Sequence, residues 1–185
     1  MANTVKILGI AGSLRRASDN HAMLIAAQSL LPVDASLDIF DLEGSPLFNQ
    51  DKEEEPHAGV DAFKQAIRAA DAIVIATPEY NYSIPGMLKN AIDCASRPYG
   101  KSAWSGKPVA IMGASVGLFG SVRAQYQLRQ CFVFLDMHPI NQPEVMISNA
   151  SKAFDAKGKL TDETSQVLIR KLLENLVLLT RQLQK

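Results

Sequence analysis

The chain alternates short, wholly apolar runs with longer segments in which apolar residues recur every three or four positions. A strand buried on both faces of a parallel sheet has no polar face, so the wholly apolar runs predict strands. One further run, which alternates weakly, predicts a short strand. The pattern as a whole predicts strands at Val5–Ile10, Ser36–Phe40, Ala72–Ala76, Pro108–Ala114 and Val145–Ile147.

The longer segments have the spacing of helices that bury one face against a sheet. They are Asn20–Leu31, Val60–Ala70, Pro85–Cys94, Val122–Leu135 and Thr161–Leu183. Pro85 suits a first helical position, whereas Ser121 and Thr161 suit helix caps. Strand and helix alternate five times without a change in composition. This predicts one three-layer α/β domain over residues 1–185, built on a five-stranded parallel sheet with helices on both faces.

Composition narrows the class of function. The 185 residues are 47% apolar, and 19 Lys and Arg balance 19 Asp and Glu, so no net field attracts nucleic acid or an anionic membrane. Cys94 and Cys131 form no C-x-x-C pair, and the histidines are isolated. We therefore expect no metal site, no nucleic-acid partner and no membrane association. The N-terminus lacks an apolar signal segment, so we expect a cytoplasmic protein.

The turn Gly12–Asn20 joins the first strand to the first helix. Gly12 allows a tight turn, and the start of a helix carries a partial positive charge. Polar side chains in this turn could hold a phosphate. They are Ser13, Arg15 or Arg16, Ser18 and Asn20. An ordinary strand-to-helix turn with a Ser or Asn cap explains the same residues, and the turn alone does not decide between the two.

The segment Thr77–Gly86 follows the third predicted strand and is stiffened by two prolines. It presents Tyr80 and Tyr82 beside a carboxylate and an amide, which suits a flat aromatic ligand with polar edges. The alternative is that one tyrosine packs on the end of the sheet. Open parallel sheets bind ligands beyond the carboxyl ends of their strands. We therefore expect three loops to converge there: Gly12–Asn20, Pro78–Ile84 and Ser115–Gly120.

Two of these loops, Gly12–Asn20 and Pro78–Gly86, resemble those of the NADPH-dependent FMN reductase family. This flavodoxin-like group includes bacterial quinone and chromate reductases and azoreductases. The resemblance extends from Val5 to about Ile147 and implies a flavodoxin-like fold with strand order 2-1-3-4-5. The family usually has a Gly-Gly pair late in the third loop, whereas here Gly120 is followed by Ser121.

The resemblance also implies one non-covalently bound FMN and assigns residues to it. It implies that the phosphate is held by Ser13, Arg15, Ser18 and Asn20. It also implies that one edge of the isoalloxazine ring is lined by Pro78, Glu79, Tyr80 and Asn81. Ser115 and Gly117 support the ring from the third loop. A phosphate with nearly two negative charges suits a turn rich in donors at the start of a helix.

The implied activity is a two-step transfer of hydride. NADPH or NADH reduces the bound FMN and leaves, and a quinone, an azo compound, chromate or free flavin then takes its place. FMN carries the chemistry, so no catalytic side chain is expected. The balanced charge and the Pro78–Pro85 loop favour this enzyme over a flavodoxin-type electron carrier. A regulatory protein that senses NADPH is a further alternative.

The family also implies a homodimer or a homotetramer, in which a neighbouring subunit completes the flavin site. Arg123 and Tyr126 are three residues apart and share one helix face. We name Arg123, Tyr126 and Glu144 as interface candidates. A solvated outer face accounts equally well for any one of them.

Overall fold

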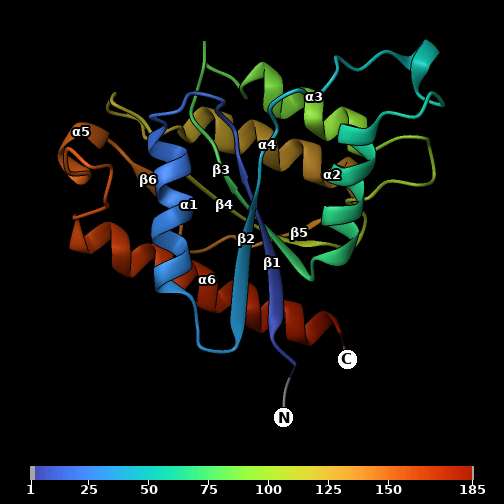
Figure 1. The fold of residues 1–185 in the computed structure, drawn as a ribbon. Helices are drawn as coiled ribbons and strands as arrows, with labels where there is room; N and C mark the ends of the chain where they lie inside the picture. Colours follow the sequence, from blue (N-terminus) through green and yellow to red (C-terminus); the bar gives the residue numbers. More distant parts are fainter. Residues whose placement is uncertain (1–2, 185) are drawn as a thin grey trace.

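The computed structural model describes residues 3–184, in which helices cover both faces of a parallel sheet (Figure 1). Strands and helices alternate along most of the chain, as the hydrophobic pattern predicts. The elements are β1 (Val5–Ala11), α1 (Asp19–Leu30), β2 (Ala35–Phe40), the short 3₁₀ helix η1 (Gln50–Lys52), α2 (Ala58–Ala69), β3 (Ala72–Ala76), α3 (Gly86–Ala95), β4 (Pro108–Ala114), α4 (Val122–Leu135), β5 (His138–Pro139), β6 (Val145–Ile147), α5 (Ala150–Ala153) and α6 (Glu163–Leu183).

All the strand pairs are parallel, and the sheet has the order β2-β1-β3-β4-β5. The expected order 2-1-3-4-5 is confirmed. The fifth strand differs from the prediction, because two short strands share the free edge of β4. β5 pairs with its beginning, where Pro108 is opposite His138, and β6 pairs with its end, where Met112 is opposite Val145. The sequence pattern missed β5 because this strand has two residues, one of them proline.

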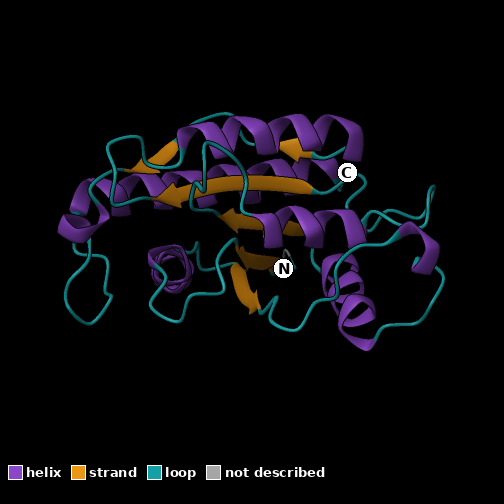
Figure 2. Ribbon diagram, turned by 90° about the horizontal axis from the view of Figure 1, so that it is seen from above, coloured by secondary structure: helices purple, strands orange, loops and turns teal. Residues whose placement is uncertain are grey.

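The wholly apolar strands are explained by two separate cores, one on each face of the sheet. On β3, Val74 and Ala76 lie in the core beneath α1 and α6, while Ile73 and Ile75 lie in the core beneath α2, α3 and α4. Figure 2 shows helices on both sides of the strands. Burial of each large aliphatic side chain contributes about 1.5–3 kcal/mol, so both faces of the central strands stabilise the sheet.

The helices begin close to their predicted positions, and α4 begins at Val122 as predicted, but the roles predicted for three residues at helix starts differ. Pro85 occupies the N-cap position of α3 instead of its first turn. Asp162, and not Thr161, caps α6, because its Oδ2 accepts a hydrogen bond of 2.7 Å from the N–H of Ser165. Ser121 precedes α4 but makes no capping bond. A carboxylate at a helix start outcompetes the neighbouring hydroxyl because it also interacts favourably with the helix dipole.

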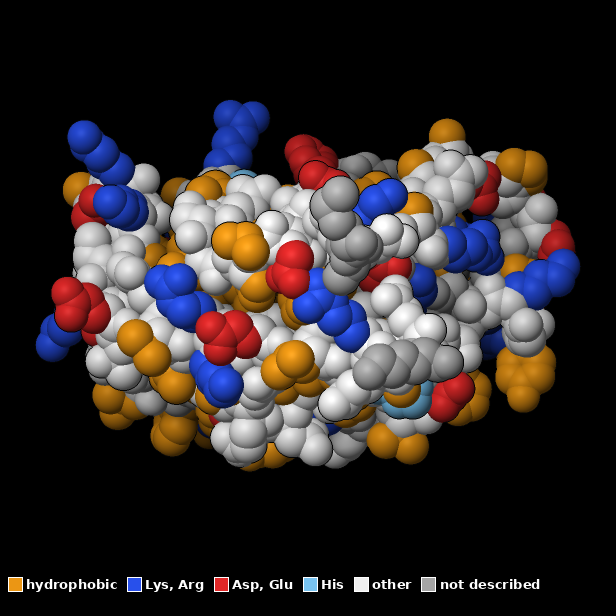
Figure 3. Space-filling view, turned by 90° about the horizontal axis from the view of Figure 1, so that it is seen from below, with side chains coloured by type: hydrophobic (Ala, Val, Ile, Leu, Met, Phe, Trp, Pro, Cys, Tyr) orange, Lys and Arg blue, Asp and Glu red, His pale blue; other side chains and the backbone are white. Residues whose placement is uncertain are grey.

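The outer surface carries mixed charge. Seen from below, at the amino ends of the strands, acidic and basic side chains are interspersed without a large field of either sign (Figure 3). Within residues 3–184, no helix is both long enough and apolar enough to cross a membrane. The same residues contain no group of three or more His, Cys, Asp or Glu side chains that could hold a metal ion.

Gly113 allows the start of α4 to lie directly against β4. A Cβ atom at this position would be 1.9 Å from Ser121 Oγ and 2.4 Å from the carbonyl oxygen of Thr77. Gly120 has a positive φ of 51°, and a Cβ there would be 2.6 Å from the carbonyl carbon of Met146. Ser121 follows in the left-handed region with φ 69°, which is uncommon for a residue other than glycine. Close backbone approach therefore fixes the path into α4.

Replacing Gly113 with alanine should lower the free energy of unfolding by about 3 kcal/mol or more, because neither Ser121 nor the Thr77 carbonyl can move away without breaking the packing of α4. Gly86→Ala is the matched control. Gly86 begins α3 with open space around it, so alanine should leave the stability within about 1 kcal/mol of the original. Urea denaturation measures both. Equal midpoints for the two variants would contradict this account of α4.

Candidate functional site

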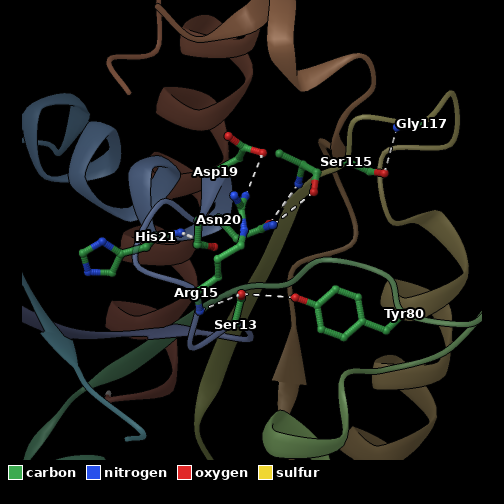
Figure 4. A network of polar contacts seen from close by, with 10 residues as sticks. Ser13, Arg15, Asp19, Asn20, His21, Tyr80, Ser115 and Gly117 are labelled. Atoms are coloured by element: carbon green, nitrogen blue, oxygen red, sulfur yellow. Dashed lines mark hydrogen bonds and ion pairs between the residues drawn. The ribbon is translucent and has the colours of Figure 1, made fainter. Parts of the chain in front are cut away.

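Three loops meet at the carboxyl ends of β1, β3 and β4, as the parallel topology predicts (Figure 4). We call them loop 1 (residues 12–18), loop 2 (residues 77–85) and loop 3 (residues 115–121). The Ser13 hydroxyl on loop 1 lies 3.2 Å from the Tyr80 hydroxyl on loop 2, within hydrogen-bond distance. On loop 3, the N–H of Gly117 donates to Ser115 Oγ at 3.1 Å. The three loops therefore lie next to one another along the carboxyl edge of the sheet.

The side-chain amide of Asn20 joins α1 to the end of β4. Its Nδ2 donates to the carbonyl oxygen of Ala114 at 3.0 Å, and the N–H of Ala114 donates to its Oδ1 at 2.9 Å. Asn20 is 3% exposed, so both bonds are shielded from water. The pair fixes the position of loop 1 relative to loop 3, which continues from Ala114.

Loop 1 presents several hydrogen-bond donors where α1 begins. The Ser18 hydroxyl caps the helix by accepting from the N–H of His21 at 3.4 Å. In the described chain, no group accepts from the N–H groups of Asp19 and Asn20 at the helix start. Arg15 is largely exposed, and its guanidinium lies 3.6 Å from the Asp19 carboxylate. Exposed pairs of this kind contribute at most about 1 kcal/mol, so Arg15 is free to turn toward a stronger anion.

This donor set suits a phosphate group. Free N–H groups at a helix N-terminus bind anions through their direction and through the helix dipole. A hydroxyl and a guanidinium stand beside them, on Ser13 and Arg15. Gly12 keeps the turn close to loop 2, since a Cβ there would be 2.9 Å from Thr77 Oγ1. The phosphate end of FMN therefore fits the residues present.

Glu79 ties loop 2 to α4. Its side chain is 7% exposed, and its Oε2 accepts from the N–H groups of Arg123 at 2.9 Å and Ala124 at 3.4 Å. Its Oε1 forms an ion pair with the Arg123 guanidinium. The hydrogen bond that the Arg123 guanidinium donates to this carboxylate raises the pKa of Arg123. Glu79 is thus the cap that Ser121 does not provide.

Asn81 and Tyr82 form the tip of loop 2. The N–H of Tyr80 donates to the carbonyl of Ser83 at 3.1 Å, and the N–H of Ser83 donates back at 3.0 Å. Both central residues have positive φ, 51° and 67°, which is the conformation of a tight two-residue hairpin turn. The Arg123 guanidinium lies 3.6 Å from the centre of the Tyr82 ring and 4.7 Å from that of Phe119. The tip is therefore rigid and aromatic.

Most of the predicted site residues are brought together, but they do not all face open space. Ser18, Asn20 and Pro78 are buried beneath the loops. Tyr80 is 48% exposed between loops 1 and 2. A cavity of about 230 Å³ separates loops 2 and 3. It is lined by Glu79, Asn81, Ser115 and Gly117 from the predicted set, and also by Tyr82, Leu118, Phe119, Ser121 and Arg123.

Arg123 and Gln127 also contribute to this site, although the sequence predicts neither of them for it. Helical spacing places Arg123 on an outer face and therefore predicts it at a subunit interface. Gln127 holds loop 2 through its Nε2, which donates to the carbonyl of Tyr82 at 3.0 Å, and its Oε1, which accepts from the Ser83 hydroxyl at 2.6 Å. Neither contact has a local sequence signal, since each spans more than forty residues.

The fold and the site define a class. A 2-1-3-4-5 parallel sheet with a donor-rich turn after β1 and an aromatic turn after β3 is a flavodoxin-like protein. The sequence profile of the NADPH-dependent FMN reductases matches residues 5–152. The chain belongs to the NADPH-dependent FMN reductase family. The fold, and an oxidoreductase family that uses FMN with NAD(P)H, are therefore confirmed.

Individual relatives support the same family assignment. The chain is 53% identical to an NAD(P)H-dependent FMN reductase of Pseudomonas aeruginosa, with 100% of both chains covered. It is 44% identical to a 2-hydroxy-1,4-benzoquinone reductase of a Burkholderia species, over 92% of this chain and 93% of that one. Among solved structures, the flavoenzyme NAD(P)H:acceptor oxidoreductase FerB of Paracoccus denitrificans superposes with a TM-score of 0.88 at 32% identity, covering 96% of this chain and 98% of FerB.

Glu79→Gln should lower the free energy of unfolding by about 1–2 kcal/mol, the usual contribution of a helix cap, because the neutral amide cannot accept from two N–H groups and pair with Arg123. Glu54→Gln, at an exposed position in the segment between β2 and α2, is the matched control and should change stability little. Chemical denaturation compares them. A Glu79 variant as stable as the Glu54 variant would show that the carboxylate does not anchor α4.

Proposed function

We propose that this chain binds one FMN across its three loops and uses it to transfer hydride from NAD(P)H to a quinone. The observation that carries this proposal is the open N-terminus of α1, where two N–H groups without partners in the described chain lie beside the Ser13 hydroxyl and Arg15. Family membership and the quinone reductases among the relatives support the same activity.

The phosphate end of FMN is assigned to loop 1. Ser13 and Arg15 bind the phosphate directly, together with the N–H groups at the start of α1. Ser18 and Asn20, assigned to the same phosphate, contribute mainly by shaping the loop, because one caps α1 and the other is bonded to Ala114. These two residues therefore preorganise the donors that the phosphate meets.

The ring end of FMN is assigned to loops 2 and 3. Tyr80 supplies flat apolar surface, the buried Pro78 stiffens the loop beneath the ring, and Asn81 supplies an amide and a backbone N–H that no other described residue takes. Glu79 contributes by holding loop 2 against the start of α4. Ser115 and Gly117 support the ring from the opposite side of the cavity. Together these residues orient the ring and leave one face open.

When bound, FMN supplies the hydride acceptor and the hydride donor of the two half-reactions. The protein then needs no side chain that exchanges protons with the substrate. Its backbone N–H groups in loop 2 can stabilise negative charge at the polar edge of the ring. A quinone is a flat molecule with polar ends, so the exposed aromatic rings of Tyr82 and Phe119 suit its entry.

We further propose that the protein is a homodimer or a homotetramer. Leu118 and Phe119 on loop 3 are 75% and 60% exposed, and Val133 and Phe134 at the end of α4 are 84% and 78% exposed. The two pairs lie near opposite ends of α4, and large apolar side chains exposed at each are typical of subunit interfaces. Of the interface candidates, Tyr126 on α4 donates to Glu144 Oε1, in the segment before β6, at 2.8 Å, and this hydrogen bond raises the pKa of Tyr126.

A single FMN-binding domain and a cytoplasmic location complete the proposal. The C-terminal helix α6 packs into the same core as α1 and β4, which supports one domain over residues 1–185. Both cysteines are free thiols in the structure, as is usual for proteins of the reducing cytoplasm.

Arg15→Ala should weaken FMN binding by about 10- to 100-fold, the value of one charge-assisted contact to phosphate, and should leave the affinity for riboflavin unchanged because riboflavin lacks the phosphate. Arg170→Ala, on the exposed face of α6, is the control and should affect neither ligand. Fluorescence titration of apoprotein gives all the dissociation constants. An equal loss for FMN and riboflavin would remove Arg15 from the phosphate site.

Phe134→Glu should shift the protein toward a smaller species in sedimentation velocity, because a charge at the centre of an apolar interface opposes association. Val33→Glu, at an equally exposed position in the turn before β2, should not change the sedimentation coefficient. A wild-type protein that sediments as a monomer at micromolar concentration would contradict the proposed oligomer.

A further inference from the structure

A second cavity, of about 260 Å³, lies on the other side of loop 1 from the cavity between loops 2 and 3. It is enclosed between loop 1 and the segment that follows β2. Ser13 and Arg15 line both this cavity and the phosphate turn, so the two sites share one wall. Figure 4 shows the His21 imidazole pointing toward this side, away from Tyr80 and Ser115.

The cavity combines an apolar floor with a rim of donors. Ile39 at the end of β2 is half-buried there on the face of the sheet that α1 covers. The Phe40 ring turns to the other face, 4.9 Å from that of Phe63, and Leu42 is buried. Arg16 and His21 stand on the rim. In the described part of the chain, no hydrogen bond or ion pair engages either side chain. An exposed guanidinium beside a free imidazole offers several donors to an anion.

Two carboxylates also line the cavity, and only one of them already has a hydrogen-bond partner in the protein. Asp41 accepts from the N–H of Glu43 at 2.9 Å, so it is held within its own turn. Glu43 is exposed at the rim, and no described residue forms an ion pair with it. The cationic side of the cavity is thus on loop 1 and the acidic side is on the segment after β2.

We propose that this cavity binds the adenosine end of NADPH, with the adenine over Ile39 and the 2′-phosphate on Arg16 and His21. The inference rests on the proposed placement of FMN. With the nicotinamide at the ring end, an extended dinucleotide that reached this cavity would cross loop 1, whose Ser13 and Arg15 line the cavity. NADH has a hydroxyl in place of the 2′-phosphate, so Arg16 and His21 determine the preference between the two.

Glu43 limits this preference. Its carboxylate faces the same space as a phosphate with nearly two negative charges, and like charges in one site repel. A variant without the Glu43 charge should therefore become more selective for NADPH over NADH. Such a gain of selectivity is a useful test because misfolding cannot produce it.

The first experiment measures kcat/KM for NADPH and for NADH with FMN-loaded enzyme. Arg16→Ala should lower the NADPH-to-NADH ratio by about tenfold, mainly through the KM for NADPH, and Glu43→Gln should raise it several-fold. Arg170→Ala is the control and should leave the ratio unchanged. A ratio that stays within twofold for both rim variants overturns the proposal.

The second experiment measures binding without turnover. Adenosine 2′,5′-bisphosphate and 5′-AMP are titrated into the FMN-loaded protein by calorimetry. The bisphosphate should bind at least tenfold more tightly than 5′-AMP, and Arg16→Ala and His21→Ala should each reduce this difference. Equal binding of the two nucleotides, or a difference that both variants retain, overturns the proposal.

Failure of the proposed function is distinguishable from failure of this inference. The visible absorbance of each preparation reports its FMN content before any nucleotide is added. A protein that takes up no FMN refutes the flavin site itself, and with it the premise of the second cavity. A protein that keeps its FMN but does not distinguish the two nucleotides refutes the second cavity alone.

Discussion

The buried amide of Asn20 is the contact on which the site depends. It closes two hydrogen bonds with the backbone of Ala114, ninety-four residues away, and so fixes the start of α1 against the end of β4. Without it, the N–H and the carbonyl of Ala114 would be buried and unpaired, at a cost of about 1–3 kcal/mol each. The position of loop 1 relative to loop 3 is therefore fixed before a ligand binds, so binding costs no free energy to bring the two loops together.

Two helices, α1 and α4, begin at this edge of the sheet, and they differ in whether a carboxylate caps the N-terminus. This difference explains why a negatively charged ligand would be attracted to α1 and not to α4. The N-terminus of α4 is neutralised by Glu79, which is also paired with Arg123. The N-terminus of α1 keeps two N–H groups free of partners in the described residues, with Arg15 beside it. A chain with zero net charge thus keeps, in α1, a helix N-terminus that no carboxylate caps within the described residues, because field strength at a helix terminus depends on its cap.

Much of the fold could be predicted, because buried strands and one-sided helices leave periodic patterns. The contacts that build the site leave none. Asn20 looks like an ordinary helix residue, and Glu79 looks like a loop carboxylate, until the fold brings Ala114 and α4 to them. β5 was missed because hydrogen bonding to β4 defines it, and not composition. The tip Asn81-Tyr82 carried a partial signal, since asparagine tolerates positive φ, but the adjacent tyrosine does not share that preference.

The most direct test of the central claim is a crystal structure of the protein with FMN bound. We expect the phosphate within hydrogen-bond distance of Ser13, Arg15 and the first N–H groups of α1, with both bonds between Asn20 and Ala114 intact. A phosphate bound elsewhere, or a loop 1 that separates from β4 to receive it, would contradict a site organised in advance by these contacts.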